Sequence, residues 1–490
     1  MSDLPYIPCF LGGREVPARD GFEKHDPATG RPSARVAEAD ADLVDQAVAR
    51  ARAALRGPWG ATTLAERITF LERLADRLEE RLDLLVSEEI ADTGKPITIT
   101  TQVEIPRAIA NFRAFAQIAR EAEEEMFDTP MAGGARARNR ILRQPVGVVG
   151  IVAPWNLPLL LLTWKVAPAL VCGNTIVVKS SEHSPRTALM LARIAAEAGL
   201  PDGVLNVIHG HGAGAAGGFL VAHPGVNAIT FTGETRTGEA IMRAAAEGPR
   251  PVSLELGGKN PALVFGDCDL AAAIAGTTRS MFDNCGQVCL TTERVFVHRS
   301  VFGRFAEGLV AAAQNLRPGD PRAAETTLGP AISAVQRDKV LGLYAGARAD
   351  GATVLTGGGA LEMPAPFTEG YWVAPTLWTG LPDDAEICRR EVFGPCAHLS
   401  IFDDEDEVIA RANASEFGLA ATVWSGDAAR AERVAGRLES GTVWINCWRV
   451  RDERAPFGGF KRSGIGREGG VRSLDFYSEL KTLCAYEPAR

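Results

Sequence analysis

Hydrophobic residues in the first quarter of the chain recur every three or four positions, which is the period of an amphipathic helix. The stretch AERITFLERLADRLEERLDLLVSEEI is typical of this pattern, which runs through residues 42–120. From Val146 onward, short β-branched runs alternate with helical stretches, as in VGVVGIV, NTIVVKS, VLNVI, NAITF and VSLEL. This alternation predicts a parallel sheet covered by helices. We therefore expect a helical lead-in followed by an α/β domain.

A second set of β-branched runs follows Leu290, namely RVFVH, ATVLTG, AATVWSG and GTVWIN, and predicts a second doubly wound domain. Residues 133–144, GGARARNRILRQ, read as an isolated exposed strand, with a loop as the alternative. The most apolar stretch, residues 157–172, contains Lys165 and two internal prolines and is too short to span a bilayer. A core helix is the better interpretation.

Composition narrows the function classes. The 490 residues suggest roughly three domains of about 150 residues. A net charge of −9 disfavours nucleic acid and anionic membrane surfaces as partners. The nine cysteines include no paired Cys-x-x-Cys motifs and the seven histidines are dispersed, so we expect reduced thiols and no metal site. The start, MSDLPYIPCFLGG, lacks a basic segment followed by an apolar run, and we expect a cytoplasmic protein.

Two glycine-containing segments could bind a phosphate group. GAGAAG at residues 212–217 fits G-x-G-x-x-G between a strand and a helix, but a chain with 51 glycines also produces this pattern by chance. FTGETRTG at residues 231–238 is the better candidate, because backbone N–H groups at a helix start attract anions. Glu234 in this loop would repel a pyrophosphate, and a plain strand-to-helix turn is the alternative.

Lys179 and Glu182 close the strand NTIVVKS, at the sheet edge where doubly wound folds bind ligands. A carboxylate there can accept both ribose hydroxyls of NAD and would repel the extra phosphate of NADP. A surface ion pair is the alternative.

Three residues are candidates for catalysis. Cys289, in FDNCGQVCLTTERV, follows a glycine that permits close backbone approach and is a candidate nucleophile, although most cysteines are packing residues. Glu255, which precedes two glycines, is a candidate general base or a strand-end charge. Asn156, between two prolines, has an amide that could donate to an oxyanion, or it is a turn former or helix cap.

Taken together, these segments resemble the aldehyde dehydrogenase superfamily in order along nearly the whole chain. The motifs that carry the resemblance are PWN, K-x-x-E, FTG, ELGGK, GQ-x-C, EVFGP, FGLAATVW and PFGGFKRSGIGREGG.

The resemblance implies a fold with two doubly wound α/β domains and a small β extension for oligomerisation. It assigns residues 1–125 and 146–256 to an NAD-binding domain and residues 257–456 to a catalytic domain. Residues 126–145 and 471–490 form the extension, which implies a homodimer or homotetramer because an edge strand would otherwise be exposed.

The resemblance also implies how NAD binds. The cofactor crosses the FTG helix start, with its adenosine ribose on Lys179 and Glu182 and its nicotinamide ribose on Glu391, near Phe393; the hexad at residues 212–217 is not the main phosphate site. The full set of expected cofactor contacts is Trp155, Lys179, Glu182, Phe231, Gly233, Glu234, Gly257, Glu391 and Phe393.

The implied reaction begins when the Cys289 thiolate adds to the aldehyde carbon. The Asn156 amide and the Cys289 backbone N–H hold the oxyanion. Hydride passes to NAD⁺, and water deprotonated by Glu255 hydrolyses the thioester on Cys289.

A narrower resemblance, in FTGETRTGEAIMRAA, SMFDNCGQVCL, TWKVAPALVCGN and WRVRDERAPFGG, is to the branch that oxidises 2-hydroxymuconic and 2-aminomuconic semialdehydes in aromatic catabolism. In that branch a glutamate at Glu234 is usual. Arg107 and Arg451 match its positions for binding the substrate carboxylate, which suits the planar guanidinium; Trp164 is a third substrate-side candidate. The alternative is an ion pair, with Arg451 satisfied by Asp452.

Two residues depart from the branch. Ser180 replaces a proline after the ribose-binding lysine, and Arg449 stands where the branch tends to be apolar, either at the pocket mouth or facing solvent. Whether the substrate carries a 2-hydroxy or a 2-amino group stays open.

Other activities also compete with the muconic semialdehyde interpretation. A dehydrogenase for betaine aldehyde or a general aldehyde is the nearest alternative, and Glu255 argues against a CoA-acylating relative. A catalytically silent protein on the same fold and a cysteine hydrolase are more distant, the latter because no histidine lies in a base motif.

Overall fold

The computed structural model describes residues 4–488, and its largest sheet has eight strands in the order β22-β12-β11-β8-β9-β10-β2-β3. The five strands from β12 to β10 are parallel, and β22, β2 and β3 are antiparallel additions at the two edges. The strands are β2 (Cys9–Leu11), β3 (Arg14–Val16), β8 (Val148–Val152), β9 (Thr175–Lys179), β10 (Leu205–Ile208), β11 (Ala228–Thr232), β12 (Val252–Glu255) and β22 (Gly464–Ile465).

Helices cover both faces of this sheet. Val149 and Ile151 of β8 pack in the core formed with α2, α5, α6 and α7, whereas Val148 packs in the core formed with α1, α8 and α9. Burial on both faces explains why the strands read as continuous apolar runs. The helices are α1 (Ala41–Arg56), α2 (Leu64–Glu79), α5 (Ile105–Glu121), α6 (Pro158–Val171), α7 (Arg186–Glu197), α8 (Ala216–Ala222) and α9 (Thr235–Ala246).

A second sheet has seven strands in the order β15-β16-β17-β14-β13-β19-β20, all parallel except β15. Helices α10 and α11 pack on one face, and α14 and α15 on the other. These elements are β13 (Asn260–Val264), β14 (Thr292–His298), β15 (Thr353–Thr356), β16 (Thr376–Thr379), β17 (Cys396–Phe402), β19 (Ala420–Trp424), β20 (Thr442–Ile445), α10 (Leu270–Phe282), α11 (Phe302–Gln314), α12 (Ala334–Ala349), α13 (Glu386–Arg389), α14 (Glu405–Asn413) and α15 (Ala428–Arg437). The two doubly wound sheets predicted from the sequence are confirmed.

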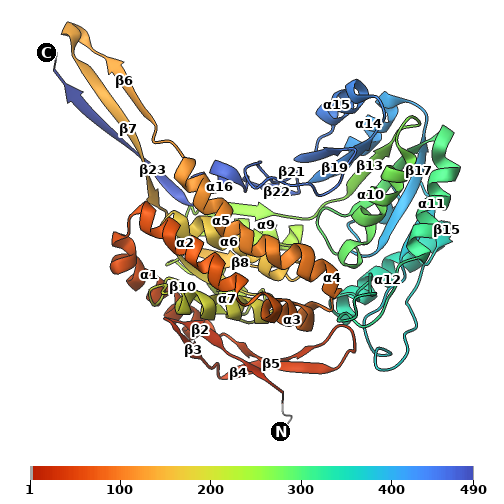
Figure 1. Cartoon of the computed structure of the whole chain (residues 1–490), viewed down its shortest axis with the longest axis horizontal. Coiled ribbons are helices and arrows are strands. Elements are labelled where there is room, and N and C mark those ends of the chain that lie inside the picture. The colour runs from red at the N-terminus through yellow and green to blue at the C-terminus, as the bar shows by residue number, and fades with distance from the viewer. Residues whose placement is uncertain (1–3, 489–490) are drawn as a thin grey trace.

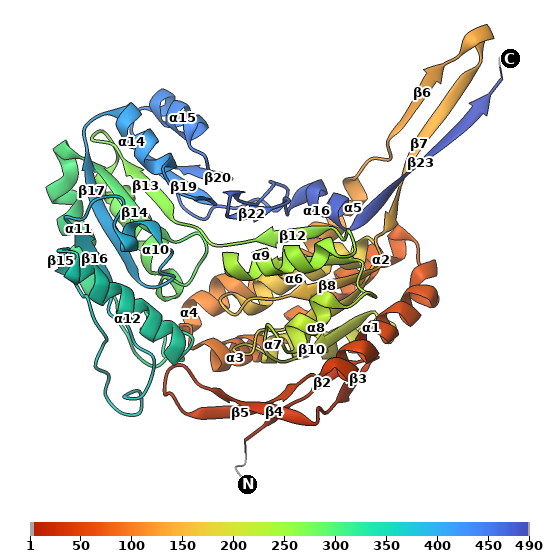
Figure 2. The ribbon, with the colours of Figure 1, turned by 180° about the vertical axis from the view of Figure 1, so that it is seen from behind.

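A three-stranded arm extends away from both sheets, as Figures 1 and 2 show. It consists of β6 (Met126–Pro130), β7 (Arg136–Pro145) and β23 (Ser478–Glu487), with β7 in the centre. The exposed strand predicted within residues 133–144 is therefore present. It is not isolated, because β7 pairs antiparallel along its length with the C-terminal strand β23.

The sequence interpretation missed the strands before residue 40. Three of them, β1 (Tyr6–Ile7), β4 (Asp20–His25) and β5 (Pro32–Glu38), form a small separate sheet. They are short or carry charged residues on exposed positions, so no clear period of two is visible. The remaining elements are α3 (Leu82–Thr93), α4 (Ile97–Ile99), a π-helical turn (Thr100–Glu104), β18 (Phe417–Gly418), β21 (Phe460–Lys461) and α16 (Gly470–Phe476).

The apolar stretch after Leu157 forms α6, a buried helix against the first sheet, as predicted. Within residues 4–488, no helix is both long and apolar enough to cross a membrane. The same residues contain no cluster of three or more histidine, cysteine, aspartate or glutamate side chains arranged to hold a metal ion.

Candidate active site

Three of the predicted site residues lie at the carboxyl ends of parallel strands in the first sheet. Asn156 follows β8, Glu234 follows β11 as the N-cap of α9, and Glu255 is the last residue of β12. Adjacent parallel strands end at one edge, where open α/β sheets bind ligands. The topology therefore brings these side chains together although they are far apart in sequence.

The backbone before Cys289 approaches the second sheet closely. Asn284, Cys285 and Gly286 all have left-handed backbones, and a Cβ on Gly286 would lie 2.1 Å from the Gly394 carbonyl oxygen. The glycine before Gln287 is thus required by contact, as the motif suggested. The Cys289 carbonyl oxygen accepts a hydrogen bond of 2.8 Å from Asn260 Nδ2, which fixes the cysteine at the start of β14.

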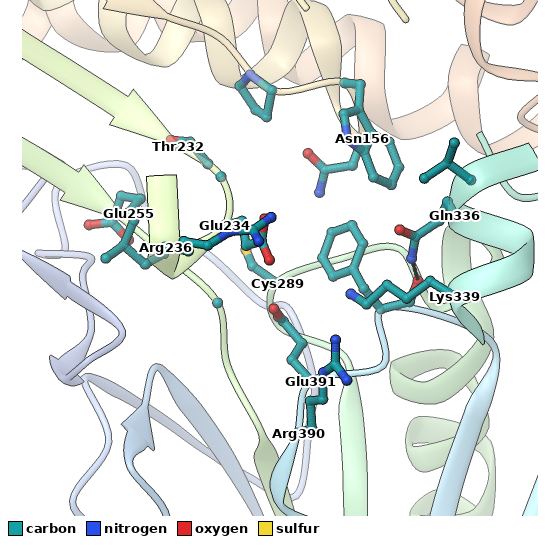
Figure 3. Close-up of a pocket in the computed structure, with 17 residues that line it drawn as sticks. Asn156, Thr232, Glu234, Arg236, Glu255, Cys289, Gln336, Lys339, Arg390 and Glu391 are labelled. Carbon is teal, nitrogen blue, oxygen red and sulfur yellow. Dashed lines mark hydrogen bonds and ion pairs between the residues drawn. The ribbon is translucent and has the colours of Figure 1, made fainter. Parts of the chain in front are cut away.

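A cavity of about 390 Å³ contains Cys289, and Figure 3 shows the side chains around it. Its walls come from the first sheet, from α12 and from the loop before β17. The polar and charged residues that line it are Asn156, Thr232, Glu234, Arg236, Glu255, Cys289, Gln336, Lys339, Arg390 and Glu391.

A second, narrower cavity of about 60 Å³ meets the first at Thr232, Glu255 and Cys289. Its walls are mostly apolar, with three arginines and one further glutamate. The lining residues not shared with the first cavity are Arg107, Leu157, Leu160, Leu161, Trp164, Val288, Leu290, Trp444, Arg449, Arg451, Phe457 and Glu468. Cys289 therefore stands where a large and a small ligand site join.

Glu255 is buried, and neither carboxylate oxygen has a hydrogen-bond partner among residues 4–488. Burial raises its pKa well above the ordinary range, and the nearby Glu468 raises it further. Lys165, Arg451 and Arg467 oppose this effect without cancelling it. A carboxyl group with raised pKa and free oxygens can accept a proton from a thiol or a water molecule.

The Cys289 thiol is half-buried, and desolvation raises its pKa to about 12. The charges of Glu255 and Glu391 raise the pKa further, whereas Arg449 and Arg451 lower it. In the unliganded chain the sulfur therefore keeps its proton at neutral pH. Formation of a thiolate requires a base within the site.

The Asn156 side chain is fixed by its neighbours. Its Nδ2 donates to the Gln287 carbonyl oxygen at 3.0 Å, and its own backbone carbonyl accepts from Asn284 Nδ2 at 2.9 Å. Lys95, which is fully buried and paired with Glu104, lies 3.4 Å from the same carbonyl. One of the two Nδ2 hydrogens is used by Gln287, which leaves the second for a ligand in the cavity.

Six of the predicted cofactor contacts surround the large cavity as one group. Glu391 Oε1 accepts from the Gly258 backbone at 2.9 Å, and a Cβ on Gly257 would lie 2.4 Å from Glu391 Oε2. The Phe393 ring lies edge-on to Trp155, with 5.3 Å between the ring centroids. Gly233 and Glu234 complete the group, with Glu234 turned toward Arg236 on the exposed side.

The structure does not place Phe231, Lys179 and Glu182 in the walls of either cavity that contains Cys289. The Phe231 ring is buried under Gly233. Lys179 is buried and pairs with Glu182 at 3.2 Å. Glu182 and His183 line a third cavity, which is separate from the two that contain Cys289. Burial would raise the pKa of Glu182, but Lys179 and His183 together hold it below its usual range.

Ser180 stands where the resemblance leads us to expect a proline, and a hydrogen-bonding contact with His209 holds it in place. Its hydroxyl lies 2.6 Å from His209 Nδ1, and the other ring nitrogen lies 3.1 Å from the Pro8 carbonyl oxygen. Burial lowers the pKa of His209 to about 3, so the imidazole stays neutral. The hydrogen bond fixes the turn that a proline ring would otherwise stiffen.

Arg107 and Arg451 both line the small cavity, but neither pairs with Asp452. Both guanidinium groups bind the same carboxylate, that of Glu453, at 3.3 and 3.1 Å. Asp452 pairs with Arg454 instead, so the predicted alternative partner is wrong. The Arg451 guanidinium also lies between Trp164 and Phe457, 4.2 and 4.3 Å from the ring centroids, and its Nη2 has no partner among residues 4–488.

Several supporting residues were not predicted from the sequence. Glu293, paired with Lys259, accepts hydrogen bonds from the backbone of Val392 and Phe393, which sets the loop around Glu391. Glu468, which pairs with Lys165, lies within the motif PFGGFKRSGIGREGG, but nothing in that motif indicated that its charge acts on Glu255.

The glycine hexad and the histidines of the described residues lie apart from the two cavities that contain Cys289. The glycine hexad at residues 212–217 forms a largely exposed loop before α8 and lines neither of them. Within the described part of the chain, no histidine lines either cavity. A cysteine hydrolase with a histidine base therefore has no support in this geometry.

Comparisons with known proteins give one answer. A family model described as "Aldehyde dehydrogenase family" matches residues 15–483. The chain is 53% identical to 2-hydroxymuconic semialdehyde dehydrogenase of Pseudomonas sp. (strain CF600), over 98% of this chain and 99% of that protein. It is 50% identical to 2-aminomuconic 6-semialdehyde dehydrogenase of Pseudomonas sp., over 97% of each. Among solved structures, the NAD⁺ complex of aldehyde dehydrogenase from Bacillus cereus superposes with a TM-score of 0.94 at 39% identity, covering 98% and 96% of the two chains.

Proposed function

This chain belongs to the aldehyde dehydrogenase family, and we propose that it oxidises a muconic semialdehyde, an aldehyde with a carboxylate at its far end, using NAD⁺. The reaction consumes the aldehyde, NAD⁺ and water and yields a carboxylate, NADH and two protons. The single observation that carries the proposal is the small cavity, which has a sulfur at one end and three arginines, including Arg107 and Arg451, in its wall.

The large cavity fits NAD in three respects. Its volume of about 390 Å³ admits a large ligand, and the missing Cβ at Gly257 leaves room for the Glu391 carboxylate, which we assign to the nicotinamide ribose. Trp155 and Phe393 supply aromatic walls for a nicotinamide ring. When bound, NAD⁺ accepts the hydride that leaves the substrate carbon. We assign the adenosine ribose to Lys179 and Glu182, outside this cavity.

Cys289 is the nucleophile in this proposal. Glu255, whose oxygens are free, takes the thiol proton, and the sulfur bonds to the aldehyde carbon. The oxygen then becomes an oxyanion, which accepts hydrogen bonds from the second Asn156 Nδ2 hydrogen and the Cys289 backbone N–H. After hydride loss a thioester remains on Cys289. Before hydrolysis, Glu255 passes the thiol proton to solvent. It then removes a proton from a water molecule whose oxygen bonds to the thioester carbon, the carbon–sulfur bond breaks, and the departing Cys289 sulfur takes up that proton from Glu255. The acid product loses a proton to solvent, which completes the two protons of the overall reaction.

The substrate carboxylate binds at Arg451 and Arg107. Glu453 holds both guanidinium groups beside the cavity, and the buried Arg451 Nη2 still has donor capacity. An unpaired buried donor on a cation is costly until a ligand accepts from it. Two cations also disfavour a positively charged substrate such as betaine aldehyde.

A substrate panel tests the proposal. The purified enzyme is mixed with NAD⁺ and a muconic semialdehyde, an unsubstituted aliphatic aldehyde of similar length, or betaine aldehyde, and NADH absorbance is recorded. We expect kcat/KM to be far higher for the muconic semialdehyde. Equal efficiency on the aliphatic aldehyde would contradict the carboxylate site.

The arm supports assembly into a homodimer or homotetramer. Its edge strands β6 and β23 carry exposed apolar side chains, including Phe127, Leu480 and Tyr486. Unpaired edges with apolar side chains are typically covered by another chain. Light scattering on the full chain is expected to give a mass of two or four subunits, and a monomer would contradict this.

A further inference from the structure

Arg449 stands on a strained turn at the wall of the small cavity. Its φ of +58° lies in the left-handed region, where a non-glycine side chain is disfavoured. Two tryptophans hold the turn in place. Trp444 Nε1 donates to the Val450 carbonyl at 2.8 Å, and Trp448 Nε1 donates to the Leu290 carbonyl at 3.4 Å. Strain of this kind persists where surrounding contacts impose it and is frequent at ligand sites.

The Arg449 guanidinium has no counter-charge in contact. Its Nη2 is buried without a hydrogen-bond partner, and it forms no ion pair with any residue in 4–488. Asp283 is near enough for Arg449 to oppose the effect of burial on the pKa of that carboxyl group, but the two do not pair. By contrast, Arg107 and Arg451 are bound to Glu453. Arg449 thus offers donors that the folded chain leaves unused.

Two unused guanidinium donors therefore come from residues two positions apart. Arg449 and Arg451 both line the cavity that ends at Cys289, and the Nη2 atom of each is buried and unpaired. A carboxylate bound at Arg451 leaves Arg449 for a second acceptor close to that carboxylate. In a 2-substituted muconic semialdehyde, the substituent is on the carbon next to the carboxylate.

We propose that Arg449 determines specificity by selecting an oxygen over an amino group at this 2-position, an inference that rests on the proposed function. A guanidinium group has five N–H donors and no acceptor. A 2-hydroxy group, or its enolate or 2-oxo form, has oxygen lone pairs that accept from it. A 2-amino group presents N–H donors, and its lone pair is conjugated with the diene, so two donors meet. Such an unmatched contact leaves the buried guanidinium unsatisfied.

The test uses three aldehydes that share a terminal carboxylate: 2-hydroxymuconic semialdehyde, 2-aminomuconic semialdehyde and the unsubstituted 6-oxohexa-2,4-dienoate. The variant Arg449→Met keeps a flexible, unbranched side chain and removes the donors. For the 2-hydroxy substrate we expect kcat/KM to fall about 10- to 100-fold, the range for a lost charged hydrogen bond. For the other two we expect a change of no more than about threefold, within the context dependence of neutral contacts.

The matched control is Arg454→Met in the same loop. Arg454 is exposed, pairs with Asp452 and lines neither cavity around Cys289, so kcat/KM for all three aldehydes should match wild type. Thermal melting establishes that each variant is folded. If Arg449→Met unfolds, Arg449→Lys serves instead, with a smaller loss that is again confined to the 2-hydroxy substrate.

The outcomes separate this inference from the proposed function. If an Arg449 variant loses the same factor on all three aldehydes, or if wild type prefers the 2-amino substrate, the selective role is overturned while the muconic activity stands. If wild type oxidises none of the three but oxidises an aliphatic aldehyde, the proposed function itself is wrong.

Discussion

The two cavities that meet at Cys289 differ in size and in polarity. The larger one carries three carboxylates balanced by three cations and extends toward α12, whereas the smaller one has mostly apolar walls with three arginines and two glutamates. Glu255 and Cys289 belong to both. A polar, roomy site suits an extended cofactor, and a narrow cationic site suits a small anionic substrate.

The residues of the two cavities are held in place in different ways. On the large side, backbone geometry at Gly257 and Phe393 shapes the wall, with Glu293 fixing the loop. On the small side, aromatic rings position the cations, as Trp164 and Phe457 do for Arg451. Changes on one side should therefore alter substrate or cofactor use separately, and changes at the junction should affect both.

The largest effect is expected at the junction itself. Cys289→Ser should lower kcat by on the order of 10⁴-fold or more, because the covalent step is lost. NADH absorbance measures turnover, and cofactor fluorescence quenching should still report NADH binding. Cys285→Ser is the control, since Cys285 is buried in the same segment but lines neither cavity that contains Cys289. Turnover that survives in Cys289→Ser would remove the basis of the mechanism.

Glu255→Gln removes the base that acts on both the thiol and the hydrolytic water, so it is expected to slow NADH formation and to stall hydrolysis of the acyl-enzyme that does form. Loss of a general base typically costs about 10²–10⁴-fold. Rapid mixing should show at most one NADH per site, with acylated enzyme visible by mass spectrometry. Unimpeded steady-state turnover would exclude Glu255 as the base for hydrolysis.

The pH profile tests the electrostatics of the junction. The general base works when deprotonated, and burial raises the pKa of Glu255 well above the ordinary range, so kcat should rise along a limb that lies at higher pH than an ordinary glutamate would give. Glu468→Gln removes a like charge and frees Lys165, and both effects lower the pKa of Glu255. The rising limb should then move to lower pH. An unchanged limb would show that another group controls it.

On the substrate side, Arg451→Ala should raise KM for a muconic semialdehyde by about 10- to 100-fold, the range for a lost charged hydrogen bond. The affinity for NAD⁺ should not change, because Arg451 does not line the large cavity. Initial rates at varied substrate and isothermal titration with NAD⁺ measure the two quantities. A selective loss of NAD⁺ binding would reverse the assignment of the cavities.

The smallest effect is expected beyond the large cavity, at the proposed ribose turn. Ser180→Ala leaves the buried His209 ring nitrogen without its partner and should reduce the free energy of unfolding by about 1–3 kcal/mol. Urea titration measures this change. Turnover with saturating NAD⁺ should stay near wild type, and a large fall in kcat would show that the turn acts on the chemistry directly.

Most of the helices and strands, and the family, could be predicted from the sequence alone. Apolar runs such as NTIVVKS are buried on both faces, and that pattern is local, so it predicts β9 and its neighbours without a fold in hand. Cys289, Glu255 and Asn156 were identified as candidates from the glycine or proline residues that lie close to them in the sequence. The short strands before residue 40 gave no comparable period and were missed.

The pairing of charged side chains became apparent only in the folded structure. The alternative considered for Arg451 was an ion pair with Asp452, its neighbour in sequence, yet Arg451 pairs with Glu453, which also binds Arg107 from α5. Arg449 could have faced solvent, and the turn held by two tryptophans places it at the cavity instead. The physical reason is that hydrophobic periodicity is set by near neighbours, whereas side-chain pairing depends on which distant segments the packed core brings into contact.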